Sequence, residues 1–167
     1  MVDVMAKWVI GAGLEEYLAQ LQDLEENTED IIKKGIYEGA AVVVSTIRNA
    51  TASLPVNEGH GTPSHKLNGV SRIQKAGLLN GLGIAPMKED GMGWNTKIGF
   101  DGYNRAKTKT WPNGQPNMMV ARSIESGTSW MQKQPFMRKA EQGSRARCEA
   151  VMSETIDKEI KKLIGEK

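Results

Sequence analysis

Apolar residues at helical spacing occupy both ends of this chain and flank a middle that is rich in glycine and proline. Positions three or four residues apart share one face of a helix. This spacing predicts an acidic helix over residues 14–26. It predicts a second helix, capped by Asn27 and Thr28, that runs to about Ala52 and ends at Leu54-Pro55. The buried stripe of the second helix is predicted to be Ile32, Ile36, Ala40, Val43, Ile47 and Ala50.

The second helix also has a thin stretch, because Gly35, Gly39, Ala40 and Ala41 have little or no side chain. Another backbone can approach closely there, from the same chain or from a neighbour. At the other end of the chain, Pro135 suits the first turn of a last helix. Its predicted buried stripe is Phe136, Ala140, Cys148, Val151, Thr155, Ile156, Ile160, Leu163 and Ile164.

Short elements separated by long loops are predicted for the middle of the chain. Residues 71–80 and 118–125 suit short helices, and residues 8–10 suit an extended start. Leu82 with Ile84, and the alternating segment Trp94–Phe100, indicate two short strands joined by a turn around residues 89–91. Two loops, 56–68 and 101–117, have few apolar residues and are expected to order only against neighbours.

These elements predict a single α+β domain over residues 1–167. It has two N-terminal helices, a small antiparallel sheet with long loops at 56–68 and 101–117, and a long C-terminal helix. At 167 residues the chain suits one domain. With nine aromatic residues against nine methionines, its core is expected to be aliphatic.

Composition excludes several classes of protein. No run of 18 apolar residues occurs, so no membrane partner is expected. The first thirty residues hold eight acidic residues and one lysine, the reverse of the basic start of a signal peptide. The lone Cys148 rules out a disulfide framework or a multi-cysteine metal site. We therefore expect a soluble protein that is used, or assembled, in a reducing cytoplasm.

No catalytic cluster stands out in the sequence. His60 and His65 have only Glu58 nearby and lie in a Gly/Pro loop, where ordering the loop opposes metal binding. The segment Gly81-Leu82-Gly83 lacks the later glycine of a dinucleotide-binding loop. Cys148 has no histidine partner nearby in the sequence. We expect no enzyme, no cofactor and no metal; a metal-dependent hydrolase is the competing class that metal analysis would test.

Charge is strongly segregated along the chain. Residues 1–30 have a net charge of −7, and residues 66–147, with fourteen basic and five acidic residues, have +9. Such a molecule can stack on copies of itself, or hold an anionic polymer with its basic middle. Alternatively, the charges belong to solvent-exposed helices and loops, and their segregation along the chain has no function.

The basic loop has some nucleic-acid character. Tyr103 and Trp111 lie among Arg105, Lys107 and Lys109, so that rings could stack on bases while cations neutralise phosphates. Nucleic-acid binding through residues 103–111 is therefore the alternative function. Such spacing is also common at exposed loop tips.

Several segments, in order along nearly the whole chain, resemble one known family. They are Gly13-Leu14-Glu15-Glu16-Tyr17-Leu18, Leu82–Pro86, Lys97–Asn104, Ala121–Ser129 and Pro135–Ala140. The two last segments follow the pattern A-x-x-x-E-x-G-T-S, a short gap, then P-F-hydrophobic-R-x-A. This ordered set resembles the small tail-component, or tail-completion, proteins of tailed phages, of the minor tail protein Z type.

The resemblance implies a non-enzymatic virion protein of the neck, assembled in the cytoplasm of the bacterial host, where the finished tail joins the head. Its motif residues Glu125, Gly127, Thr128, Pro135 and Phe136 are expected to be structural. The Glu125 carboxylate is expected to pin the tight turn at Gly127-Thr128, and Phe136 to anchor the last helix to the core.

A joining protein should repeat head-to-tail around the tail axis, most simply six times, beside other neck and tail proteins. The predicted subunit interface pairs Glu15, Glu16 and Glu25, with their acidic neighbours, against the basic middle, and takes its affinity from apolar side chains. Its residues are Glu15, Glu16, Glu25, Arg105, Lys107, Lys109, Trp111 and Trp130. Part of the basic loop is expected to touch passing DNA weakly.

Overall fold

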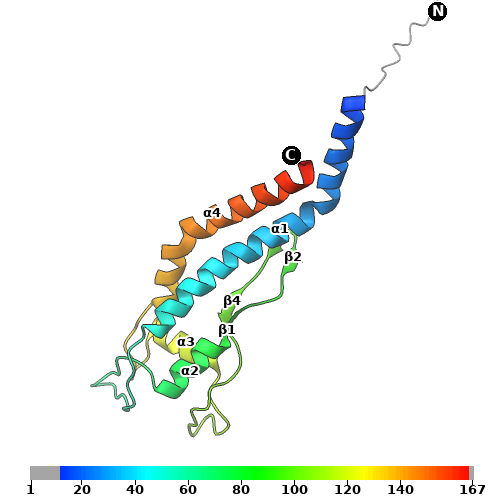
Figure 1. The fold of residues 1–167 in the computed structure, drawn as a ribbon. Helices are drawn as coiled ribbons and strands as arrows, with labels where there is room; N and C mark the ends of the chain where they lie inside the picture. The colour runs from blue at the N-terminus through cyan, green and yellow to red at the C-terminus, as the bar shows by residue number, and fades with distance from the viewer. Residues whose placement is uncertain (1–11, 166–167) are drawn as a thin grey trace, which may run out of the picture.

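The first element of the chain is one continuous helix in the computed structural model, which describes the backbone of residues 12–165 and side chains from Leu18 onward. Helix α1 spans Ala12–Ala52 (Figure 1). The predicted division into two helices at Asn27–Thr28 is therefore wrong. The Asn27 amide donates to the Asp23 carbonyl (2.8 Å) and the Thr28 hydroxyl to the Leu24 carbonyl (2.6 Å). Both side chains bond back within the helix instead of capping a new one. The predicted extended start at residues 8–10 lies outside the described residues.

The last helix, α4 (Phe136–Ile164), runs antiparallel to α1 along much of its length (Figure 1). Lys34 Nζ lies 2.8 Å from Glu159 Oε1, which links the two helices. A Cβ atom added at Gly39 would lie 2.4 Å from Met152 Cγ, so the helices are closely packed there. The thin stretch of α1 is confirmed as a site of close approach, and α4 of the same chain occupies it.

Two short helices lie between α1 and α4. Helix α2 (Arg72–Gly81) begins with a capping box: Ser71 Oγ accepts from Gln74 N (3.2 Å), and Gln74 Oε1 accepts from Ser71 N (3.0 Å). Helix α3 spans Asn117–Ser126. Both helices agree with the predictions for residues 71–80 and 118–125.

The predicted small sheet is divided into two antiparallel pairs. Strand β1 (Leu82–Ile84) pairs with β4 (Ile98–Phe100), and β2 (Lys88–Asp90) pairs with β3 (Gly93–Asn95). Ala85 N still donates to Lys97 O (2.8 Å), but Pro86 follows and has no N–H for a further rung. The pairing stops there and resumes in the β2–β3 hairpin. The α+β class is confirmed, whereas the single sheet is corrected.

The core lies where α2, α3, β1, β4 and the start of α4 meet the C-terminal part of α1. It is mainly aliphatic, with one aromatic pair, Phe100 and Phe136, whose ring centroids are 6.1 Å apart. The buried core cluster consists of Ile47, Leu54, Val70, Leu78, Leu82, Phe100, Val120, Ala121, Ile124, Met131, Phe136 and Ala140.

The predicted helical stripes are buried only near this core. Ala40 and Ile47 are buried as predicted, but Ile32 is exposed, and its neighbour Ile31 is buried instead. On α4, Phe136 and Ala140 are buried, Cys148 to Leu163 of the predicted stripe are half-buried, and Ile164 is exposed. Far from the core, α4 packs mainly against one helix, so part of its stripe remains accessible.

Backbone hydrogen bonds within the chain hold both long loops. Loop 56–68 is fastened by Leu67 N to Trp130 O (2.8 Å) and by Gln132 N to Leu67 O (2.8 Å). Loop 101–117 is closed by Asn104 N to Gln115 O (2.9 Å). The expectation that the loops order only against neighbours is therefore not met. Within residues 12–165, none of the helices combines the length and apolarity that crossing a membrane requires.

Candidate functional site

The oppositely charged segments lie at opposite ends of the molecule. The N-terminal part of α1 extends beyond the C-terminal end of α4, while both long loops lie at the far end (Figure 1). Glu25 is exposed on the extension. The side chains of Glu15 and Glu16 lie outside the described residues. The structure therefore does not bring the acidic and basic parts of the predicted interface together within one chain, and they can meet only between copies.

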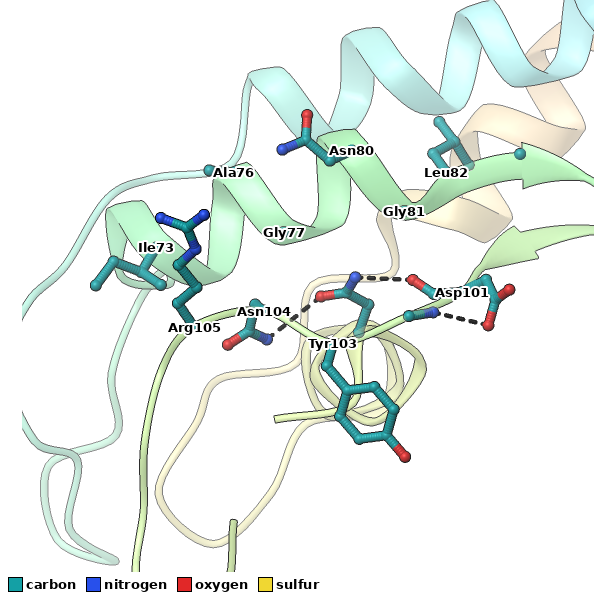
Figure 2. A pocket seen from close by; sticks show the side chains of 13 residues that line it. Ile73, Ala76, Gly77, Asn80, Gly81, Leu82, Asp101, Tyr103, Asn104 and Arg105 are labelled. Atoms are coloured by element: carbon teal, nitrogen blue, oxygen red, sulfur yellow. Dashed lines mark hydrogen bonds between the residues drawn. The ribbon is translucent and has the colours of Figure 1, made fainter. Parts of the chain in front are cut away.

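The basic residues of loop 101–117 are solvent-accessible. Arg105, Lys107 and Lys109 are exposed, and the Tyr103 side chain is 69% exposed. Figure 2 shows Arg105 reaching toward α2 beside Ile73, while the Tyr103 ring points away from that helix. Tyr103 and Arg105 line an open cleft of about 820 Å³ between α2 and the start of loop 101–117, and Ile73, Gly77 and Asn80 are among its other lining residues. Lys107 and Lys109 are not part of this lining.

Side-chain amides fix the base of this loop. Asn117 Nδ2 donates to the Asp101 carbonyl (2.8 Å), and Asn104 Nδ2 donates to Asn117 Oδ1 (3.3 Å) (Figure 2). Asn104 Oδ1 accepts from Ala106 N (2.9 Å). Asn104 and Asn117 are both almost fully buried, so these bonds satisfy amides that water cannot reach. The network determines where the basic loop leaves the core.

Two glycines of α2 make room for this network. A Cβ atom at Gly77 would lie 2.3 Å from Asn104 Cβ, and one at Gly81 would lie 2.3 Å from the Asp101 carbonyl oxygen. Sequence reasoning did not identify Asn104 and Asn117 as a pair. The signals for this pair in the sequence were the two glycines four residues apart on α2 and the Asp101–Asn104 segment.

The two tryptophans of the predicted interface occupy different places. Trp111 is half-buried, and its backbone exchanges two hydrogen bonds with Thr108 (both 3.1 Å) at the tip of loop 101–117. The Trp130 side chain is 55% exposed, and its carbonyl accepts from Leu67 N of the other loop. Neither ring belongs to the buried core cluster.

The Glu125 motif is structural, but its carboxylate has a different partner from the one predicted. Glu125 Oε2 accepts from Met137 N (2.9 Å), and Oε1 accepts from Arg138 N (3.2 Å). These are free amides of the first turn of α4, where a negative charge also complements the helix dipole. Glu125 therefore caps α4 from the end of α3 and does not pin the turn.

The turn at Gly127-Thr128 is stabilised by its own residues. Gly127 has φ +73°, and a Cβ atom there would lie 3.0 Å from Lys133 N. Thr128 Oγ1 accepts from Met131 N (3.0 Å) and from Trp130 N (3.3 Å). Pro135 precedes α4, and Phe136 is buried in the core as predicted.

An apolar groove lies between the β1–β4 pair and α3. We call it the β1–α3 groove; its volume is about 770 Å³. Its apolar lining includes Ile84, Pro86, Ile98, Met118 and Met137. Its charged lining residues are Lys97, Arg122, Asp101 and Glu125. Met118 is 68% exposed and stands at the first turn of α3. Sequence reasoning did not predict this groove, because its two walls are separated in the sequence.

The residues weighed for catalysis do not gather. His60 and His65 are exposed on loop 56–68, and the described part of the chain contains no group of three or more His, Cys, Asp or Glu residues placed to hold a metal. Burial, together with the charge of Glu149, raises the pKa of the Cys148 thiol, which disfavours the reactive thiolate.

Comparisons of this chain with protein-family models, with curated proteins and with solved structures found no match. Three surfaces of the molecule remain as candidates for function: the acidic extension of α1, the basic loop and the β1–α3 groove.

Proposed function

We propose that this protein is a non-enzymatic structural subunit of the neck of a tailed phage, or of a phage-tail-like particle, which completes the tail and joins it to the head. Its subunits form a ring, most simply of six, around the channel axis, next to other neck and tail proteins. It is assembled in the bacterial host cytoplasm and remains in the virion.

The observation that carries this proposal is the separation of complementary surfaces along one elongated chain. A closed ring of identical subunits needs two different surfaces that fit each other. Here the acidic extension of α1 and the basic loop lie at opposite ends (Figure 1). The ordered resemblance to tail-completion proteins supplies the biological setting.

Deletion of the gene tests this function. Cells that carry the deletion should accumulate separate filled heads and finished tails, visible by electron microscopy, and a plasmid copy of the gene should restore joined particles. If the deletion yields normal infectious particles, the proposed function is wrong.

The second candidate function is binding of nucleic acid through residues 103–111. The exposed ring of Tyr103 beside Arg105, Lys107 and Lys109 favours it. Binding that neutralises several phosphates releases counterions and must weaken steeply as salt rises. A salt-sensitive affinity of the isolated protein for DNA, lost on replacing the three cations with glutamine, would favour this function over the neck role.

A further inference from the structure

In the part of the chain that the structure describes, the first part of α1 extends beyond the other elements (Figure 1). Glu159 on α4 lies opposite Lys34, and α4 ends five residues later, at Ile164. Residues 12–28 of α1 therefore extend past α4, by roughly 25 Å at about 1.5 Å per residue (Figure 1). A single helix of this length is marginally stable in water, since helices in proteins depend mostly on packing of an apolar face.

We call this extension, together with Glu29 and Asp30, the α1 arm (residues 12–30). It has the apolar face that such packing requires. Leu18 is 47% exposed and Leu21 is 44% exposed, and their spacing places them on one side of the helix. Leu24 continues the same side and is half-buried. In the sequence, the arm also carries seven acidic residues and no lysine or arginine.

We propose that the α1 arm of one copy docks in the β1–α3 groove of the next copy. The groove provides an apolar lining for the leucines, in the manner of a helix bound in a hydrophobic groove. Four charged residues line the groove: Lys97, Arg122, Asp101 and Glu125. Both oxygens of Glu125 accept from amides of α4, and Asp101 Oδ1 accepts from Gly102 N, whereas Lys97 and Arg122 are exposed and can pair with the acids that flank the leucines. This inference deepens the proposed ring function and rests on it for its biological setting.

Two other occupants are less compatible with the structure. The arm cannot reach the groove of its own chain, because α1 is a continuous helix that carries the arm away from it (Figure 1). Two arms packed side by side would bring together two segments whose charged residues are all acidic, and these charges repel each other. A contact between arm and groove uses two different surfaces, which is what a ring requires.

Sedimentation of the full chain over a range of concentrations tests the contact with two matched pairs of variants. Leu21→Asp places a charge on the apolar face of the arm, and Ala19→Asp places the same charge on the opposite, exposed face. Met118→Asp places a charge at the groove, and Met92→Asp places it on the exposed β2–β3 turn. All four positions are exposed, so the variants should keep the melting temperature of the wild type within a few degrees.

We expect the wild-type chain to self-associate with rising concentration. Leu21→Asp and Met118→Asp should each weaken this association at least tenfold, while Ala19→Asp and Met92→Asp leave it unchanged. A mixture of the first two variants has one intact arm and one intact groove, so it should give dimers and nothing larger. The inference is overturned if either variant associates as the wild type does, or if the mixture forms no dimer.

The same variants in the virus separate this inference from the proposed function. If deletion of the gene blocks joining, but Leu21→Asp and Met118→Asp both support it normally, the docking contact is wrong and the neck role stands. If deletion has no effect on joining, the neck role fails, and the sedimentation experiment still decides whether arm and groove bind each other.

Discussion

At the scale of single residues, the Glu125 carboxylate is the contact with the most direct consequence for stability. Glu125→Ala removes both acceptors from the first turn of α4 and leaves the Met137 and Arg138 amides without them. Loss of a helix cap costs about 0.5–2 kcal/mol, and we expect a loss near the upper end of that range because the acceptor is charged. Urea unfolding measures this loss of unfolding free energy. The control is Glu141→Ala, which removes an exposed carboxylate within α4. Equal stability of the two variants would contradict the capping role.

Glu159 gives a prediction of pH dependence. Hydrogen bonds from Lys162 and then Lys34 lower its pKa from the ordinary 4.5 to about 2. A carboxylate with a lowered pKa in the folded state stabilises the fold above its unfolded pKa, and this contribution disappears as pH falls through the folded pKa. The melting temperature of Glu159→Gln should therefore lie slightly below that of the wild type at pH 6, and the two should converge as pH falls from about 4.5 to 2. Glu154→Gln, which removes an exposed carboxylate elsewhere on α4, is the control variant.

Residue roles were predictable from sequence when a local pattern determined them. The start of α2 at residue 71 was predicted, and the structure adds that Ser71 and Gln74, three residues apart, form its capping box. Glu125 was singled out correctly as structural, but its partner was wrong. Which amides a carboxylate meets depends on how α3 and α4 approach each other, and this is a property of the packed chain.

At the scale of elements, the packing of α2 on the base of the basic loop depends on Gly77. A Cβ atom there would lie 2.3 Å from Asn104 Cβ and 2.7 Å from Asn117 Oδ1, both of them in the buried amide network. We expect Gly77→Ala to destabilise the protein by about 1–3 kcal/mol, as overpacking does. Gly143→Ala, in α4 where nothing lies within 4 Å, should stabilise it by about 0.5–1 kcal/mol. Equal shifts of the two melting temperatures would refute the role of Gly77.

Element types were largely predictable, whereas their connections were not. The helix over residues 118–125 follows from the spacing of its apolar residues, and the start of the last helix follows from Pro135. Asn27 and Thr28 are equally suited to cap a helix or to bond back within one, which is why the predicted break in α1 was wrong. The β1–α3 groove depends on pairing between Leu82 and Phe100, which are distant in the sequence.

At the scale of the whole molecule, the chain consists of a packed end and an acidic helical arm. The tryptophan rings on the packed end differ in role. Trp94, which is half-buried, lies under Lys33 Nζ, 3.9 Å from the ring centroid, and so joins the β2–β3 hairpin to α1. Trp111, which is half-buried, and Trp130, which is exposed, lie on the loop side; like Trp94, neither belongs to the core cluster. The first ring therefore serves the fold, and the other two are available for contacts between subunits.

This difference gives the last prediction. Trp111→Ala should weaken assembly onto tails, because apolar side chains at the centre of an interface supply most of its affinity, while surface charges contribute about 0–1 kcal/mol per pair. Its melting temperature should stay within about 2 °C of the wild type. Trp94→Ala should show the opposite result, with a lower melting temperature from the lost contact with Lys33 and normal assembly. For both variants, the yield of joined particles measures assembly, and thermal unfolding measures the melting temperature. If Trp111→Ala lowers the melting temperature and leaves assembly intact, Trp111 belongs to the fold of loop 101–117, and the apolar part of the interface must lie elsewhere.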